Sequence, residues 1–302
     1  VCNAYLRSVN SAGVLNALER QHLFLFRLTD RPGRVYRYHA LFQGFLQQCL
    51  EQVEGFTAVE EWHRRVAACL LEPGGSVPVD DQATAVEHLL AAREWKAAAD
   101  AIEGLAQGLD FGALPRLEPW FERLPAKVVA GRPRLLLALG RMRERQGRWP
   151  EALATLQQAE RAALAAGSAD DLGGALQWQA WVHFRQNRYP DAIDLCQRAL
   201  AILSQEPEGS TEADRTRKLA AIHNTLAGCY VDAGNLPIGR QYALRALEAY
   251  RSLGDREREA VVLHNMATYT LPQGLLRETI ETERTSLRIL EELNSYRVCF
   301  PL

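Results

Sequence analysis

Residues that often carry chemistry are present in this sequence but are scattered along it. The histidines are His22, His39, His63, His88, His183, His223 and His264, and the cysteines are Cys2, Cys49, Cys69, Cys196, Cys229 and Cys299. They form no H-E-x-x-H motif, no CxxC pair and no nucleophile elbow. We expect His39 to cap or pack a strand-to-helix junction, and the cysteines to be reduced and packed as small apolar side chains. The sequence predicts no catalytic residue, no metal site and no cofactor.

Residue type also excludes nucleotide hydrolysis by this chain. A P-loop needs Gly-Lys-Ser/Thr, so that backbone amides and a lysine can hold phosphates. The lysines are Lys96, Lys127 and Lys218, and none follows a glycine. No G-x-G-x-x-G is present either. We therefore predict that this chain is not an enzyme.

Composition and charge limit the classes of molecule that this chain is expected to bind. The chain has 302 residues, of which 47% are hydrophobic and 24% charged, with a formal net charge of -2 and a pI near 6.4. Such a balance argues against a large nucleic-acid surface, and no direct nucleic-acid binding is expected, although Arg31, Arg34 and Arg37 cluster near one turn. We expect that cluster to be solvated or to contact another domain. The sequence contains neither a signal peptide nor a run of 18 apolar residues, which predicts a cytoplasmic protein without membrane contact.

The first elements resemble a winged helix in their order. Apolar residues with helical spacing over 14–21 are followed by "HLFLFRL", the turn "TDRPGR" and the return strand "VYRYH". From His39 onward the apolar residues return to helical spacing. This order of helix, β-hairpin and helix predicts a partial winged-helix domain over residues 1–55, with its hairpin near 23–38. Because the chain begins at Val1, within a helical pattern and without methionine, it is expected to be a fragment of a longer protein.

A repeated helical hairpin fills the second half of the chain. Each copy has a turn residue that tolerates positive φ, at Gly147, Asn187, Gly234 and Gly274. The small residues expected where two helices cross are Gly140, Ala180, Ala227 and Ala267 in the first helices and Ala152, Ala192, Gly239 and Thr279 in the second. Pro150, Pro190 and Pro237 are expected to open second helices, and Trp149, Tyr189, Leu236 and Leu276 to fill the space behind each turn.

These patterns together predict an all-α fold in which a tetratricopeptide-like α-solenoid follows the partial winged-helix unit. A single hairpin could not bury its apolar stripe, so the copies must stack. Three domains are expected: residues 1–55, irregular helical hairpins over 56–132, and long-helix repeats over 133–302. One of the irregular hairpins should turn near Arg93 and Glu94.

Several segments in this order resemble the MalT-type regulators, large ATP-binding transcription activators of the LuxR class among the signal-transduction ATPases. They include "YRYHALFQGFLQQCL", "WHRRVAACL", "AVEHLLAAREWKAAA", "LPRLEPWFERLP" and "RPRLLLALG". The resemblance covers about residues 15–290. It implies a bacterial parent protein with ATPase and helix-turn-helix modules, of which this chain would be the winged helix and the superhelical sensor.

The repeat register predicts a binding face on the first helices. In tetratricopeptide hairpins the first helix lines the concave groove, and the residues predicted to bind a ligand there are Arg141, Glu144, Gln177, Trp181, Phe184, Asn224 and His264. Leu137, Gly228 and Thr268 also face inward. Aromatic area beside hydrogen-bonding side chains suits a small polar effector, such as a sugar, or a peptide. The alternative is that Trp181 and Phe184 pack against the neighbouring repeat.

Two functions of different kinds follow. The first is an effector sensor that binds a small molecule or peptide and relays this to an ATPase module absent from the chain, with possible self-association. The second is a tetratricopeptide scaffold for a protein partner, without a small-molecule effector. An enzyme regulated by the same repeats ranks third.

Overall fold

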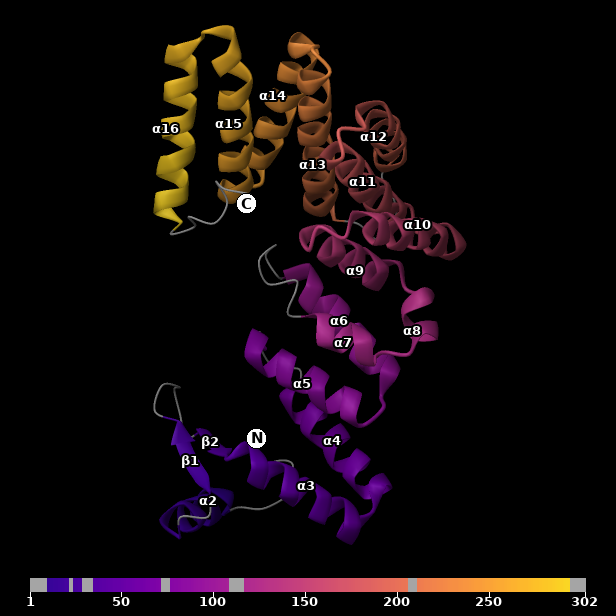
Figure 1. Ribbon diagram of the computed structural model, residues 1–302, viewed down its shortest axis with the longest axis vertical. Coiled ribbons are helices and arrows are strands. Elements are labelled where there is room, and N and C mark those ends of the chain that lie inside the picture. Colours follow the sequence, from indigo (N-terminus) through magenta and orange to yellow (C-terminus); the bar gives the residue numbers. More distant parts are fainter. Residues whose placement is uncertain are drawn as a thin grey trace. The chain divides into compact units, whose positions relative to one another are not determined.

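A computed structural model describes residues 10–21, 24–28, 35–71, 77–108, 117–205 and 211–293 (Figure 1). The chain divides into two compact units, Val1–Val128 and Val129–Leu302. The described residues are helical apart from one β-hairpin and the connecting turns. This confirms the predicted all-α class.

The first described elements of the N-terminal unit are the predicted helix, hairpin and helix. Helix α2 (Ser11–Arg20) precedes the antiparallel strands β1 (Leu25–Leu28) and β2 (Val35–Tyr38), and helix α3 (Ala40–Glu54) follows. The Tyr36 hydroxyl donates to Asn16 Oδ1, so the hairpin is tied to α2. His39 occupies the N-cap position of α3, but its side chain makes no cap hydrogen bond, so of the two expected roles side-chain capping is wrong and packing at the junction stays a prediction. Its backbone N–H instead donates to the carbonyl oxygen of Phe24 over 2.8 Å.

The basic cluster expected on the hairpin is only partly described. Arg31 and Arg34, with the turn between the strands, lie outside the described residues. Arg37 is exposed on β2.

The irregular hairpins of this unit are α4 (Phe56–Leu70), α5 (Val79–Ala91), α6 (Trp95–Gly108) and α7 (Glu118–Arg123). Arg93 has a φ of 55° between α5 and α6, as expected for the predicted turn. Glu87 of α5 accepts hydrogen bonds from Trp120 and Arg123 of α7. A polar cross-link therefore joins α5 to α7 beside their apolar contact. The short helix α8 (Ala126–Ala130) follows.

In the described part of the C-terminal unit, four helical hairpins stack on one another. They are α9 (Pro133–Arg145) with α10 (Trp149–Ala166), α11 (Ala169–Arg185) with α12 (Tyr189–Leu203), α13 (Glu212–Asp232) with α14 (Leu236–Ser252), and α15 (Arg256–Thr270) with α16 (Leu276–Glu292). A short 3-10 helix, η2 (Leu271–Gln273), ends α15. The turn residues Gly147, Asn187, Gly234 and Gly274 have φ values of 73°, 59°, 84° and 74°. The predicted register of the repeats is therefore correct.

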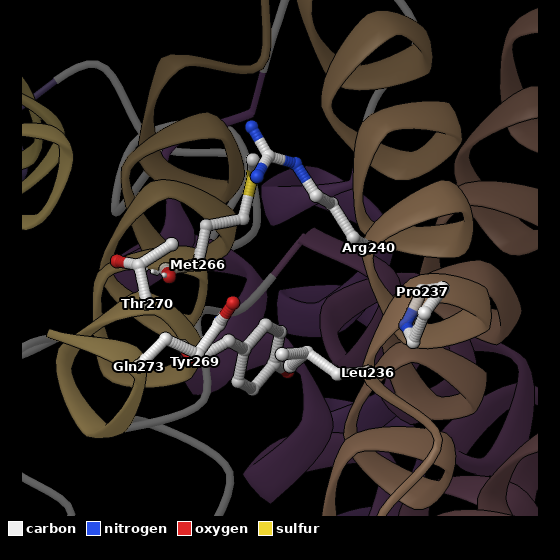
Figure 2. A pocket seen from close by; sticks show the side chains of 7 residues that line it. All are labelled: Leu236, Pro237, Arg240, Met266, Tyr269, Thr270 and Gln273. Atoms are coloured by element: carbon white, nitrogen blue, oxygen red, sulfur yellow. Dashed lines mark hydrogen bonds between the residues drawn. The ribbon is translucent and has the colours of Figure 1, made fainter. Parts of the chain in front are cut away.

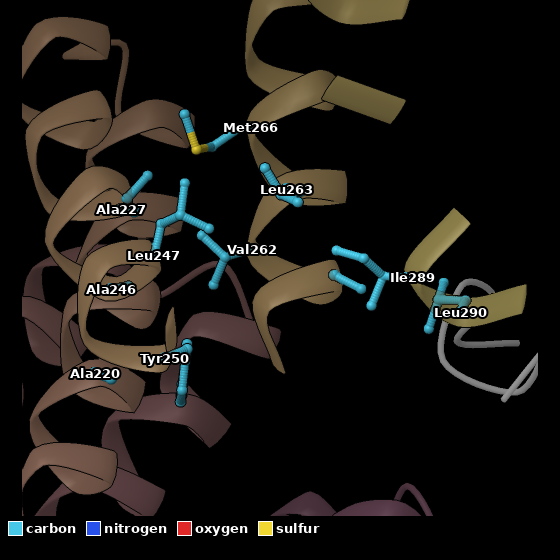
Figure 3. Packing of buried hydrophobic residues seen from close by; sticks show 12 residues of the cluster. Ala220, Ala227, Ala246, Leu247, Tyr250, Val262, Leu263, Met266, Ile289 and Leu290 are labelled. Carbon is cyan, nitrogen blue, oxygen red and sulfur yellow. The ribbon is translucent and has the colours of Figure 1, made fainter. Parts of the chain in front are cut away.

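Small residues let the two helices of each hairpin approach closely. A methyl group on Gly140 would come within 2.6 Å of Leu156, which shows that the larger side chain fills the space left by the glycine. In the last two hairpins one buried cluster joins α13, α14, α15 and α16, and Figure 3 shows Leu247, Val262 and Ile289 within it. The filling role expected for Leu276 is wrong, because 58% of this residue is exposed at the start of α16.

Candidate functional site

The predicted binding residues all lie on first helices of the repeats. Arg141 and Glu144 are on α9, while Gln177, Trp181 and Phe184 are on α11. The other two, Asn224 and His264, are on α13 and α15. Consecutive first helices contact each other, so these side chains border helix-to-helix seams. Whether they bind a ligand stays a prediction.

The seam between α9 and α11 is organised by a buried carboxylate. Glu144 is only 4% exposed, and burial raises the pKa of its carboxyl group. Arg185 approaches it, with 3.5 Å between Nη1 and Oε1, and the indole N–H of Trp181 donates to it; both interactions oppose the effect of burial. Glu144 therefore holds Trp181 and Arg185 in place and has little surface left for a ligand.

Aromatic rings continue from this seam toward the turn end of α11. The ring centroids of Trp181 and Phe184 are 5.5 Å apart, and those of Phe184 and Tyr189 are 6.1 Å apart. Phe184 also lies against the backbone of Gly228 on α13, where a methyl group would come within 2.8 Å of its Cζ. For Phe184 the structure thus shows the packing that the alternative interpretation expected. Trp181 is half-buried beside it.

Arg141 lies over an aromatic ring and is not an isolated charge in the groove. Its guanidinium carbon lies 5.0 Å from the ring centroid of Trp178 on α11. Burial, together with the positive charge of Arg258 on α15, lowers the pKa of Arg141 to about 10. At neutral pH the side chain stays charged.

The polar residues of α13 and α15 pair in two different ways. Asn265 Nδ2 donates to Asn224 Oδ1 over 3.2 Å, which links the two first helices. His264 instead lies 3.0 Å from Glu283 Oε1, measured from its Nδ1, and thus contacts the second helix of its own hairpin. Sequence reasoning missed Asn265. Its only signal was an amide next to a predicted inward position, which repeat spacing alone does not distinguish from the opposite helix face.

One pocket of about 250 Å³ lies away from these residues, between α14 and α15. Figure 2 shows Arg240 reaching from α14 toward Met266 of α15, and Tyr269 and Leu236 lining the floor. Arg240 is paired with Glu278, with 2.6 Å between Nη2 and Oε1. This pocket is smaller than the roughly 300–1,000 Å³ typical of ligand sites, and its cation is already neutralised.

The described residues contain neither a metal-binding cluster nor a membrane-spanning helix. Within the described ranges, no group of three or more His, Cys, Asp or Glu side chains is placed to hold a metal ion. In the same part of the chain, no helix is both long and apolar enough to cross a lipid bilayer.

Two segments of the chain match known protein families. Residues 1–56 match the family described as MalT winged helix domain, and residues 131–205 match the family described as tetratricopeptide repeat. The HTH-type transcriptional regulator MalT of Cronobacter sakazakii (strain ATCC BAA-894) is 32% identical over 171 residues, which cover 52% of this chain. The matched part is 18% of that relative, so the chain corresponds to less than a fifth of its length.

A solved structure shares the fold over almost the whole chain. It is the signal transduction ATPase with numerous domains (STAND) protein with a tetratricopeptide repeat sensor from Pyrococcus horikoshii. The TM-score is 0.63 at 13% identity, with 98% of this chain and 42% of that chain covered. The fold and the two family matches agree with the resemblance in the sequence. The chain therefore carries a winged helix of the MalT type followed by tetratricopeptide repeats.

Proposed function

We propose that this chain is the effector-sensing and protein-interaction region of a bacterial MalT-like transcriptional activator. The first helices of the repeats bind a small molecule or peptide, and the bound state is relayed to an ATPase module elsewhere in the parent protein. We also propose the predicted division into residues 1–55, 56–132 and 133–302, in which the last part receives the signal. The MalT-type winged helix and the repeat family match support this proposal.

The observation that carries the proposal is the direct contact between side chains of successive first helices. Glu144 of α9 engages Trp181 of α11, Phe184 of α11 rests on Gly228 of α13, and Asn224 of α13 accepts from Asn265 of α15. A ligand that contacts two of these helices changes the spacing between hairpins. In a solenoid each hairpin contacts its neighbours, so such a change passes along the stack.

Thermal unfolding of the chain tests the proposal against a panel of sugars, amino acids, nucleotides and short peptides. A ligand at about 100 times its dissociation constant adds roughly 2.7 kcal/mol of stability, which is a shift of several degrees for a chain of this size. We expect one chemical class to raise the midpoint, and Trp181→Ala to abolish the shift. Trp62→Ala, on α4 of the other unit, is the matched control and should leave the shift intact.

The scaffold function is the alternative outcome of the same experiment. If no class shifts the midpoint of a chain that unfolds cooperatively, effector sensing by this face is wrong. The repeats would then be expected to hold a protein partner, and a partner retained by the chain without any metabolite effect would support that function.

A further inference from the structure

The pocket between α14 and α15 lies on the opposite side of α15 from the predicted binding residues. Successive side chains of a helix point about 100° apart, so Met266 and Thr270 point to the side opposite His264. Leu236 and Arg240, from the first two turns of α14, form the facing wall (Figure 2). A ligand in this pocket would therefore be held between the third and fourth hairpins.

The pocket exists because this junction lacks aromatic side chains that the preceding junction has. Between α12 and α13, the residue that opens the second helix is Tyr189, and its side chain crosses to Asp232 at the end of α13. The corresponding residue of α14 is Leu236, which is shorter and has no polar tip. Likewise, the repeat register places Thr270 of α15 where α13 has Tyr230. The space left open is therefore of the kind that a ring fills elsewhere in the stack.

The interior of the pocket offers an apolar surface. Leu236, Met266 and the Tyr269 ring line it. Two of its polar side chains are hydrogen-bonded within the chain. Thr270 Oγ1 donates to the carbonyl oxygen of Met266 over 3.2 Å, and Gln273 Nε2 donates to that of Tyr269 over 2.7 Å. A ligand group that enters is therefore buried without having to supply a hydrogen bond, which suits an apolar group.

The volume of the pocket sets the size of that group. It is about 250 Å³, which is below the range of drug-sized ligand sites. A cavity of roughly 150 Å³ is nevertheless enough to bind benzene. The pocket therefore has room for one phenyl ring or one branched aliphatic group, together with the atoms that link it to the mouth.

Charges of both signs lie at the mouth. Arg240 lines the pocket with its side chain about half exposed, and its Nη2 lies 2.6 Å from Glu278 Oε1 of α16. This bond uses one of the five N–H donors of the guanidinium group and one of the two carboxylate oxygens. The other donors and the other oxygen can hold a carboxylate and an ammonium group side by side. Because the pair has no net charge, it complements a zwitterion better than an anion or a cation.

We propose that this pocket binds a free α-amino acid with a large apolar side chain, such as phenylalanine or leucine. The side chain enters between Leu236, Met266 and Tyr269. The α-carboxylate binds Arg240 and the α-ammonium group binds Glu278. Such a ligand contacts α14, α15 and α16, and so holds the third hairpin against the fourth. The site is separate from the first-helix face of the proposed function, so either can fail without the other.

Isothermal titration calorimetry of the 302-residue chain with L-phenylalanine and L-leucine tests the inference. We expect saturable binding of both. The analogue 3-phenylpropionate lacks the ammonium group, and phenethylamine lacks the carboxylate, so each should bind at least tenfold more weakly than phenylalanine. L-Alanine keeps both charges but not the large side chain and should also bind at least tenfold more weakly. Equal affinity for phenylalanine and 3-phenylpropionate would overturn the inference.

Two variants with matched controls locate the site. Leu236→Tyr gives this junction the ring of the preceding one and should abolish binding without lowering the unfolding midpoint. Leu276→Tyr makes the same change at the same place in the next hairpin, where the residue is 58% exposed, and should leave affinity unchanged. Arg240→Gln should weaken binding at least tenfold. Arg198→Gln, which breaks a similarly exposed pair with Glu160, should not.

The outcomes separate this inference from the proposed function. Binding that survives in Leu236→Tyr and is lost in Trp181→Ala would overturn the inference and make the amino acid an effector of the first-helix face. Absence of amino-acid binding, with another panel class raising the unfolding midpoint, would overturn the inference and leave effector sensing supported. Absence of both effects would overturn both proposals.

Discussion

Gly239 of α14 lies directly on the backbone of Ala227 in α13. A methyl group on Gly239 would be 2.9 Å from the carbonyl oxygen of Ala227 and 2.5 Å from Cγ2 of Val231. The two helices of this hairpin therefore approach so closely at Gly239 that no side chain fits on this residue. Because the closest backbone atom belongs to a helix, it cannot rotate away as the end of a side chain would.

We predict that Gly239→Ala destabilises the C-terminal unit by about 1–3 kcal/mol, because α13 and α14 must move apart. Gly174→Ala is the matched control in the interior of α11, where the added methyl meets only Leu137 Cδ1 at 3.5 Å. For Gly174→Ala we expect the free energy of unfolding to rise by roughly 0.5–1 kcal/mol, because alanine has lower conformational entropy than glycine in the unfolded chain. Urea unfolding followed by far-UV circular dichroism measures both. Equal effects of the two variants would contradict the close approach.

A histidine pair predicts pH sensitivity in the N-terminal unit. His63 Nδ1 of α4 and His88 Nδ1 of α5 are 2.7 Å apart. Burial lowers the pKa of both below the usual 6.5, and the neighbouring imidazole lowers that of His88 further; Glu51 of α3 opposes the shift at His63, and Glu87 opposes it at His88. As pH falls below about 6.5, the unfolded state takes up protons first, so stability is lost as pH falls through the folded pKa values.

Hydrogen exchange of the α4 and α5 amides between pH 7 and pH 5 measures this effect, after correction for the intrinsic pH dependence of exchange. Protection should fall with acidification in the wild-type chain. In the double variant His63→Asn/His88→Asn, the two amides can keep one hydrogen bond. Its protection should fall less on acidification than that of the wild-type chain. His264→Asn in the other unit is the control and should behave as wild type in α4 and α5. The same loss of protection in the double variant would show that the pair is not the titrating element.

A buried carboxylate between two arginines predicts non-additive mutations. Glu259 is 3% exposed and accepts from Arg251 Nε at 2.8 Å and from Arg256 Nη1 at 2.6 Å. We expect Arg251→Ala or Arg256→Ala alone to cost about 1 kcal/mol, because one partner remains. The double variant should cost about 3 kcal/mol or more, because it leaves a buried charge unpaired.

Denaturant unfolding of the two single variants and the double variant gives the coupling energy. Arg240→Ala, which removes a partly exposed pair with Glu278, is the control and should cost less than about 1 kcal/mol. Strict additivity of the two arginine variants would mean that Glu259 does not need both partners.

Burial predicts a large difference in cysteine reactivity. Burial, together with the negative charge of Asp232, raises the pKa of the Cys229 thiol to about 12, whereas Cys49 is only half-buried on α3. Since the thiolate is the reactive form, native Cys229 should resist iodoacetamide at pH 8 while Cys49 is alkylated. Mass spectrometry of tryptic peptides measures both, with the protein unfolded in urea as the positive control. Alkylation of native Cys229 as fast as Cys49 would contradict its buried position.

Local features of the repeats could be predicted because they depend on single residue types. Gly147 and Asn187 tolerate positive φ where a helix ends, and Pro150 and Pro190 fit the first turn of a helix, whatever the rest of the chain does. The β-hairpin before α3 could also be predicted from its residue pattern. These signals recur in each copy, and the recurrence by itself implies stacking of the hairpins.

Side-chain contacts between different helices could not be predicted in the same way. His264 and Asn265 are adjacent in the sequence, yet one contacts Glu283 of its own hairpin and the other Asn224 of the hairpin before. Successive side chains of a helix point about 100° apart around its axis, so adjacent residues can face different neighbouring helices. The spacing of the repeats does not show which neighbour each side chain contacts. The burial of Glu144 and the contact of Phe184 with Gly228 depend on the same packing.

Residue types and their spacing along the chain were enough to predict the order of elements and the register of the repeats, and they carry the MalT-type resemblance. They did not show that Trp181 is held by Glu144, that Asn224 pairs with Asn265 or that His63 meets His88. The physical reason is that a hydrogen bond requires two groups at about 3 Å, and that distance is set by how separate helices pack.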